Sequence, residues 1–164
     1  MTIDRMICET IQLHGEEILS SENMQRSKGF VHHGDTSVYE HSVGVAYVSL
    51  MLARKWRLRL DERSLVRGAL LHDYFLYDWH IPTSHEGLHG FKHAAVAHKN
   101  AIRDFQLNRI EKNIIIRHMF PLNLTPPRYR ESLLVCLADK LCAVYEVFSY
   151  TYMGDTTRKL LLEE

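Results

Sequence analysis

The chain has 164 residues, of which 46% are hydrophobic and 24% charged, and glycine and proline are sparse. This composition is typical of a globular protein and excludes a disordered or fibrous one, and the length suits a single domain over residues 1–164. The 20 basic and 20 acidic residues balance, so no net charge draws the chain to nucleic acid or to an anionic membrane.

Apolar side chains recur at helical spacing over residues 3–18, which predicts a first amphipathic helix. Thr2 or Asp4 can cap its N-terminus by accepting a hydrogen bond from a free backbone N–H. Residues 29–36 then combine glycine with polar side chains, and we expect a loop there.

Two further helices are predicted before residue 73. The first is long, is capped by Thr36 or Ser37 and continues to about Trp56, and the second begins at Asp61 and ends near His72. Basic residues cluster around the turn between them. We interpret this cluster as a solvated helix end favoured by the helix dipole, with a phosphate-rich partner as the weaker alternative. The cluster comprises Arg54, Lys55, Arg57, Arg59, Arg63 and Arg67.

The helical pattern breaks over residues 74–90, where proline, glycine, aromatic residues and histidines predict an irregular loop. It returns over residues 91–105, 109–119 and 129–152. No segment shows sustained strand alternation, and no internal repeat occurs. We therefore expect an all-α fold, a single compact bundle of about six or seven helices.

The cysteines and the N-terminal residues predict the cellular setting. Cys8, Cys136 and Cys142 are odd in number and lie in apolar helical segments, as reduced core residues do. The N-terminus lacks the apolar region of a signal peptide, and no apolar run approaches the roughly 18 residues that a membrane span needs. We expect a soluble cytoplasmic protein.

Potential metal ligands recur at the ends and on the inward faces of these helices. The adjacent pair His72–Asp73 closes the third helix, where an imidazole and a carboxylate can ligate one divalent ion. His41 shares the inward face of the long helix. Asp139 lies on an apolar face of the last helix, where an uncompensated carboxylate is costly. A buried ion pair between Asp139 and an arginine is the alternative.

Two more histidines occupy helix ends. His93 opens the helix over residues 91–105, and His118 closes the one over residues 109–119. Either alone would be interpreted as a surface or capping histidine, but five sites that converge on helix ends and inward faces favour a metal centre. Three other histidines are interpreted as ordinary surface or half-buried residues: His14, His32 and His98.

The order His41, His72–Asp73, Asp139 on a helical background resembles the HD-domain superfamily of metal-dependent phosphohydrolases. The resemblance covers residues 27–152, and residues 37–46 are similar to the helix that carries the first histidine of that family. It implies an all-helical fold and a divalent metal held by these side chains. Fe, Mn, Co or Ni suits such imidazole-rich ligands better than Mg.

The resemblance leaves the number of metal ions open. Binuclear members, among them cyclic-dinucleotide phosphodiesterases and symmetrical dinucleoside tetraphosphatases, add two histidines before the last aspartate, and His93 and His118 fall in those places. Single-metal members do without them. The chain also has Met119–Leu122 where the cyclic-dinucleotide branch has its Gly-Tyr-Pro signature, which argues against cyclic-di-GMP as the substrate.

The activity implied is hydrolysis of a small phosphate ester, either a monoester or a diester, with a nucleotide as the expected substrate. A metal lowers the pKa of its bound water, and the resulting hydroxide attacks phosphorus. Asp73 is expected to bridge the ions and to act as the catalytic residue. The alternative is a non-catalytic, metal-stabilised domain that senses a nucleotide or a protein and binds it without turnover.

Basic residues near the ligands are candidates for substrate binding. Arg26, Lys28 and His33 precede the first-histidine helix and suit a phosphate, with a polar surface loop as the alternative. Lys140 can reach a phosphate or pair with a nearby glutamate or with solvent. The aromatic residues of the loop over residues 74–90 can stack a nucleobase or pack as a hydrophobic flap.

A homodimer is also possible, because apolar residues gather near the C-terminus and large exposed apolar patches mark interfaces. These residues are Tyr150, Tyr152, Leu160, Leu161 and Leu162.

Overall fold

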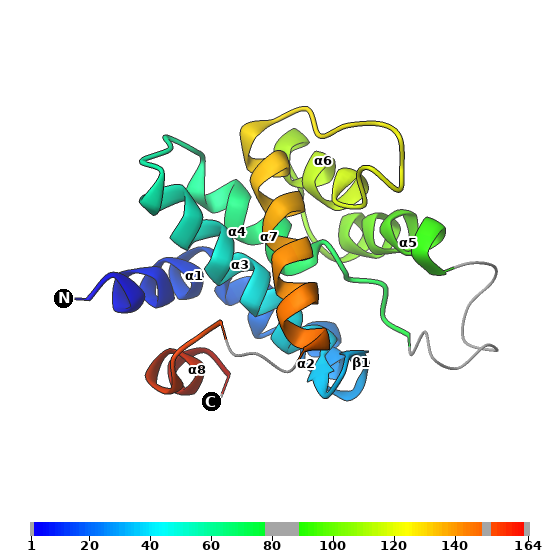
Figure 1. The fold of residues 1–164 in the computed structure, drawn as a ribbon. Coiled ribbons are helices and arrows are strands. Elements are labelled where there is room, and N and C mark those ends of the chain that lie inside the picture. The colour runs from blue at the N-terminus through cyan, green and yellow to red at the C-terminus, as the bar shows by residue number, and fades with distance from the viewer. Residues whose placement is uncertain (1, 78–88, 149–151, 163–164) are drawn as a thin grey trace.

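Helices dominate the computed structural model, which describes residues 2–77, 89–148 and 152–162 (Figure 1). The elements are α1 (Ile3–Leu19), α2 (Glu22–Arg26), the 3₁₀ helix η1 (Ser27–Gly29), β1 (Val31–His33), β2 (Thr36–Ser37), α3 (Val38–Lys55), α4 (Glu62–Leu71), α5 (His89–Asp104), α6 (Arg109–Arg117), α7 (Arg130–Val147) and α8 (Asp155–Leu162). The predicted all-α fold is confirmed, and each predicted helix corresponds to an observed one.

Two of the α-helices in the described part of the chain were not predicted. The five residues of α2 are too few to show periodicity, and the last helix ends at Val147 and not at residue 152, so that α8 is a separate element after Gly154. α8 packs against α1. Among the described residues, no helix is both long and apolar enough to cross a membrane.

The helix caps follow the side-chain chemistry of the residues before each helix. Thr2 accepts a hydrogen bond from the backbone N–H of Arg5, and Asp61 accepts one from Ser64. At α3 the cap is reciprocal, because Ser37 accepts from the N–H of Glu40 while the Glu40 carboxylate accepts from the N–H of Ser37. Such capping boxes fix where a helix begins, and here they fix the start of the helix that carries His41.

The core lies where α3 packs against α4 and α7 and where α4 packs against α6 (Figure 1). α3 is buried on nearly every side, including Val43, Val45 and Leu50. Cys8, Cys136 and Cys142 are buried free thiols, as expected. α3, α4, α6 and α7 therefore share one apolar centre, and polar residues on their inward faces must meet inside it.

One member of the basic cluster does not lie on the surface. Arg67 is buried, with Nε 3.0 Å from a carboxylate oxygen of Glu111 and Nη1 2.7 Å from one of Glu17. It lies one turn further along α4 than Arg63, where the helix faces α6 and α1. The interpretation of the whole cluster as a solvated helix end is therefore wrong for Arg67, because tertiary packing supplies the carboxylates that its burial requires.

The loop predicted over residues 29–36 contains a short antiparallel hairpin. Val31 pairs with Ser37 and His33 with Thr36, and Gly34 makes the turn with a φ of 55°. The backbone N–H of Val38 donates to the carbonyl of Phe30 at 2.8 Å. These bonds place the hairpin directly against the first turn of α3.

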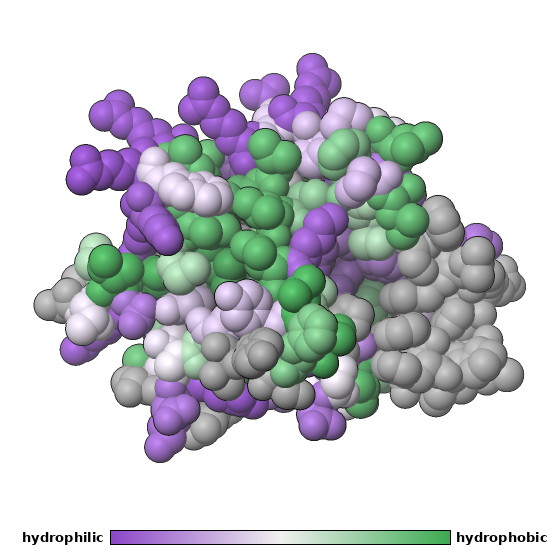
Figure 2. Space-filling view, viewed as in Figure 1, coloured by the Kyte–Doolittle hydropathy of each residue, from purple (hydrophilic) through white to green (hydrophobic). Residues whose placement is uncertain are grey.

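Apolar side chains on the outer face of α7 are exposed, and Figure 2 shows hydrophobic surface gathered over this helix. We call this set the α7 stripe: Leu133, Leu137, Leu141, Val144 and Phe148. The C-terminal residues expected to support a dimer differ in exposure, and Leu160 is 43% exposed. Leu161 is buried, Tyr152 is partly buried, and Tyr150 lies outside the described residues.

Candidate metal centre

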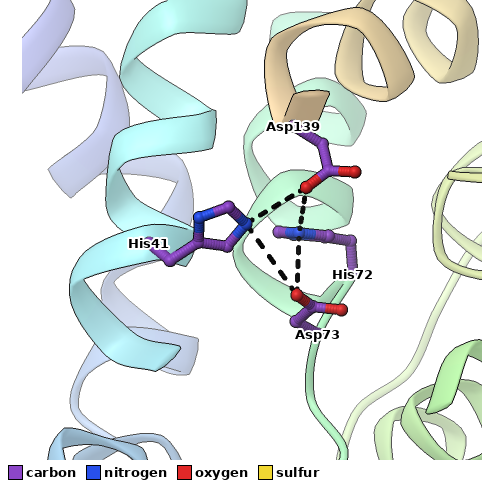
Figure 3. Close-up of side chains that lie close together, drawn as sticks. All are labelled: His41, His72, Asp73 and Asp139. Carbon is purple, nitrogen blue, oxygen red and sulfur yellow. Dashed lines mark hydrogen bonds and ion pairs between the residues drawn. The ribbon is translucent and has the colours of Figure 1, made fainter. Parts of the chain in front are cut away.

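Four of the predicted ligands meet in the core (Figure 3). His41 comes from α3, His72 and Asp73 follow the last residue of α4, and Asp139 comes from the middle of α7. All four are buried, and one ligand atom from each lies within 4.8 Å of the others. His41 Nε2 is 3.1 Å from Asp139 Oδ1, and His72 Nε2 is 3.4 Å from Asp73 Oδ2. The nitrogen and oxygen atoms thus face one small volume.

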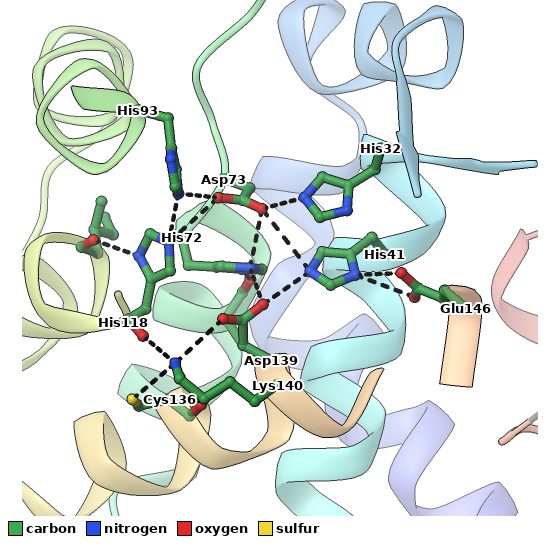
Figure 4. Close-up of polar contacts among 12 residues, drawn as sticks. His32, His41, His72, Asp73, His93, His118, Cys136, Asp139, Lys140 and Glu146 are labelled. Atoms are coloured by element: carbon green, nitrogen blue, oxygen red, sulfur yellow. Dashed lines mark hydrogen bonds and ion pairs between the residues drawn. The ribbon is translucent and has the colours of Figure 1, made fainter. Parts of the chain in front are cut away.

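A second group shares Asp73 with the first. Asp73 Oδ1 lies 3.3 Å from His93 Nε2 and 3.4 Å from His118 Nε2, and these two nitrogens are 2.9 Å apart (Figure 4). Oδ2 of the same carboxylate faces His41 and His72. The structure therefore brings all six predicted ligands together as two groups joined by one carboxylate.

The local backbone fixes which nitrogen of two of these rings faces the centre. His72 directly follows α4, and its Nδ1 donates to the carbonyl of Ala69 at 2.7 Å. His118 directly follows α6, and its Nδ1 donates to the carbonyl of Ile115 at 2.7 Å. Because a carbonyl oxygen only accepts, the proton must lie on Nδ1. Each ring therefore turns Nε2 inward, as metal-ligating histidines commonly do.

The first group combines positively charged histidines with negatively charged aspartates. Burial opposes the charge on His41, but hydrogen bonds to Asp139 and Glu146 outweigh it and raise the pKa of His41 to about 9. The pKa of His72 also lies well above its ordinary value, because nearby carboxylates outweigh its burial. Burial would raise the pKa of Asp73 and Asp139, but the histidines hold both well below the usual range.

The second group is less strongly charged. Burial lowers the pKa of His118 in spite of its contact with Asp73, so this ring is neutral near pH 7. A neutral imidazole with its proton on Nδ1 offers the Nε2 lone pair to a metal.

The residues fit a divalent cation. Among the described residues, His72 Nε2 and Asp73 Oδ1 are buried side-chain atoms without a hydrogen-bond partner, which is costly in a protein core unless a cation or water compensates it. Asp73 Oδ1 points into the second group and His72 Nε2 into the first. Mixed imidazole and carboxylate donors suit mid-row divalent ions.

His32 is a residue of the centre that sequence reasoning missed. It is buried, its Nε2 donates to Asp73 Oδ2 at 2.7 Å, and its ring stacks on His41 with centroids 4.0 Å apart. Its interpretation as an ordinary surface or half-buried histidine is therefore wrong. The unrecognised hairpin explains the error, because side chains alternate along a strand and β1 turns His32 toward α3.

Glu146 was also missed. Its carboxylate accepts a hydrogen bond from Nδ1 of His41, at 2.8 Å to Oε2. The signal was present in the sequence, because Glu146 follows Asp139 by seven residues and two helical turns bring such residues to the same face.

Of the four predicted substrate-binding residues, the structure places one beside the centre. Lys140 Nζ donates to the carbonyl of His118 at 2.8 Å and lies 3.8 Å from Asp139 Oδ2 (Figure 4). Arg26 and Lys28 are exposed; Lys28 Nζ lies 4.7 Å from the centroid of the Tyr39 ring.

Most of the other positions predicted for substrate contacts lie outside the described residues, and the described Tyr77 ring lies against Phe75 with centroids 4.9 Å apart. The side chain of His33 lies outside the description, as do residues 78–88, which make up most of the predicted aromatic loop.

Comparison with known families agrees with this geometry. A family model of the HD domain matches residues 38–144, more than half of the chain. The chain belongs to the HD domain family. Members of this family are mostly metal-dependent hydrolases, and the buried His/Asp cluster is compatible with that chemistry. Searches of curated proteins and of solved structures found no match to the chain.

The boundaries of the HD domain match separate two sets of residues in the centre. The match begins at Val38, the first residue of α3, and ends at Val144 in α7. All six predicted ligands lie within it. His32 and Glu146 lie just outside, one before and one after, yet both contact ligands.

Proposed function

We propose that this HD domain is a metal-dependent phosphohydrolase that acts on a small phosphate ester, with a nucleotide as the expected substrate. The observation that carries the proposal is the shared carboxylate of Asp73, whose two oxygens face two groups of buried ligands. His41, His72, Asp73 and Asp139 would hold one cation. Asp73, with His93 and His118, would hold a second.

His41, His72, Asp73 and Asp139 would hold a divalent cation that would supply a bound water of lowered pKa and positive charge near the phosphoryl oxygens. The chain itself supplies orientation. His72 and His118 are fixed by their bonds to backbone carbonyls, and the Asp73 carboxylate contacts histidines of both groups. Lys140, whose Nζ lies 3.8 Å from Asp139 Oδ2, is a cation close enough to the centre to approach a bound phosphate. Imidazole donors favour Fe, Mn, Co or Ni over Mg.

The test combines metal content with hydrolysis. We expect the purified protein to contain one or two equivalents of a mid-row divalent metal and to hydrolyse an aryl phosphate or a member of a nucleotide panel. Asp73→Ala should reduce hydrolysis at least about 100-fold, since loss of a mere partner of a ligand already costs about 10–100-fold, with the helical circular-dichroism spectrum retained. Asp155→Ala, in the exposed first turn of α8, is the control and should retain activity.

Metal stoichiometry tests the second group separately. Two equivalents in the wild-type protein and one in His93→Ala would support a binuclear centre. Equal hydrolysis by wild type and Asp73→Ala would refute the proposed function. Tight nucleotide binding without turnover, across several metals, would instead support a sensor domain.

A further inference from the structure

We propose that Glu146, held in place by Tyr152, is a positioning residue that orients His41 for metal binding and so sets the metal affinity of the centre. The inference rests on the metal-binding part of the proposed function. Glu146 and Tyr152 both lie beyond the HD domain match.

Both nitrogens of His41 contact carboxylates of α7. Nε2 lies 3.1 Å from Asp139 Oδ1, and Nδ1 lies 2.8 and 3.1 Å from the two oxygens of Glu146 (Figure 4). An ionised carboxylate only accepts, so Nδ1 must carry the proton that it donates to Glu146. With one proton fixed on Nδ1, the nitrogen that can bind a metal is Nε2, which faces the other ligands of the first group. A bound cation would take the place of the Nε2 proton.

Glu146 is placed to accept the proton of His41, because both of its carboxylate oxygens lie within hydrogen-bond distance of Nδ1. Carboxylates that accept from a ligating histidine fix its orientation and raise its basicity. His72 and His118 use backbone carbonyls for the same purpose, so among these three histidines His41 differs in using a charged side chain.

Glu146 is itself held. Tyr152 Oη donates to Glu146 Oε1 at 2.7 Å, and Glu146 is buried. The tyrosine reaches this position across α3, where Gly44 follows His41 by three residues. A Cβ at Gly44 would overlap the hydroxyl of Tyr152, so the absence of a side chain there makes room for the contact. The carboxylate therefore has a donor on each side, and its position is constrained.

The same residues allow another interpretation. His32, His41 and Glu146 have ligand atoms within 4.8 Å of one another and could in principle hold a cation of their own. His41 argues against this, because its Nε2 already belongs to the first group and its Nδ1 is needed as the donor to Glu146. A cation at that position would require both nitrogens of one ring to give up their protons.

The decisive measurement is the affinity for Mn²⁺, determined by calorimetry on the full-length protein after chelator treatment. Removing an outer partner of a metal ligand costs about 10–100-fold in affinity, and we expect a loss in this range for Glu146→Leu. Glu146→Gln keeps an acceptor for the Nδ1 proton and should recover most of the affinity. Tyr152→Phe removes the donor to Glu146 and should lower the affinity roughly fivefold.

The matched control is Glu131→Leu. Glu131 is also a buried glutamate of α7, but its Oε1 accepts from the backbone N–H of Asp61 at 2.9 Å. This variant should lose stability and keep the wild-type affinity for Mn²⁺. A spectroscopic readout separates orientation from packing: in the Zn²⁺-loaded protein, ¹⁵N NMR should show the Nδ1–H form of His41 in the wild type and a changed Nδ1 signal in Glu146→Leu.

The failures are distinguishable. If the wild-type protein binds no Mn²⁺, the proposed function fails together with this inference. If wild type and folded Glu146→Leu bind Mn²⁺ equally, or if Glu131→Leu loses as much affinity, the positioning role is refuted while the proposed function stands. If Glu146→Leu does not fold, Tyr152→Phe and Glu146→Gln provide the test. The positioning role is refuted if both variants keep the wild-type affinity for Mn²⁺ and the wild-type Nδ1 signal of His41. Binding of an additional equivalent that is lost in both His32→Ala and Glu146→Leu would favour the separate cation site.

Discussion

His41 and His72 are held as imidazolium ions in the metal-free protein by the carboxylates around them. A nitrogen that ligates a metal needs its lone pair, so cation binding must displace the proton on Nε2 of each ring. Metal and protons therefore compete for the same atoms, and the apparent metal affinity should increase with pH. In the metal-free protein, charges of opposite sign compensate one another only in part, since His72 Nε2 and Asp73 Oδ1 still lack hydrogen-bond partners.

This competition predicts a pH dependence for the stability of the metal-free protein. The pKa of His41 is about 9 in the folded state and 6.5 in a model peptide, so its ion pairs stabilise the fold fully below pH 6.5. That contribution is lost as pH rises from 6.5 to 9, at up to about 1.4 kcal/mol per pH unit for one proton. Urea unfolding in the presence of a chelator at several pH values measures it.

The control for this experiment is His41→Gln, which should remove part of the pH dependence. Saturating Mn²⁺ should oppose the decline, because the cation replaces the protons that are lost. A free energy of unfolding that stays constant or increases between pH 6.5 and 9 in the metal-free protein would contradict the assignment of charge to these histidines.

At the scale of elements, two helices end at ligands and must pack closely for those ligands to meet. α4 ends just before His72, and α6 ends just before His118. The helices approach each other at Gly68, where an added Cβ would overlap the side chain of Ile114. The spacing between α4 and α6, and with it the relation between the two ligand groups, depends on a residue without a side chain.

We therefore expect Gly68→Ala to lower the free energy of unfolding by about 1–3 kcal/mol, the usual cost of overpacking a core. The displacement of α6 should also weaken metal binding by the group that contains His118. Chemical denaturation and calorimetry measure the two effects. Gly29→Ala is the control, because a Cβ there meets nothing within 4 Å. Equal stability of the two variants would show that α4 and α6 separate without cost.

At the scale of the whole molecule, the centre is completed by segments outside the region that defines the family. The hairpin before α3 contributes His32, and the residues around the end of α7 contribute Glu146 and Tyr152.

The apolar outer face of α7 is a second feature of the whole molecule. Its side chains recur every three or four residues, and Leu133 and Phe148 are 59% and 67% exposed.

The α7 stripe predicts self-association. Isolated exposed apolar residues are common, but a continuous row on one helix is typical of an interface, and two copies can pack such rows against each other about a two-fold axis. We expect a concentration-dependent dimer in analytical ultracentrifugation and a monomer after Leu133→Glu with Val144→Glu. Leu124→Glu is the control, since Leu124 is 86% exposed but lies outside α7. A wild-type monomer at all concentrations would contradict the prediction.

The sequence predicted much of the fold and the residues that cluster. Helical periodicity located each long helix, and capping chemistry placed the starts of α1, α3 and α4. The six candidate ligands were predicted because histidine and aspartate on inward faces and at helix ends are conspicuous against an apolar pattern. Short elements carried no such signal. β1 has three residues and β2 has two, which is too few to show alternation. His32 was misassigned as a result.

What the sequence determined by itself is local: where helices begin, which faces are apolar, and which polar residues lie on those faces. These features depend on neighbours three or four positions apart along the chain. Tertiary structure decided which partners those polar residues meet. Asp73 divides its oxygens between two groups, Arg67 is buried with Glu111, and Glu146 bonds to His41 from 105 positions away. Such contacts depend on how helices pack, and no local pattern records that.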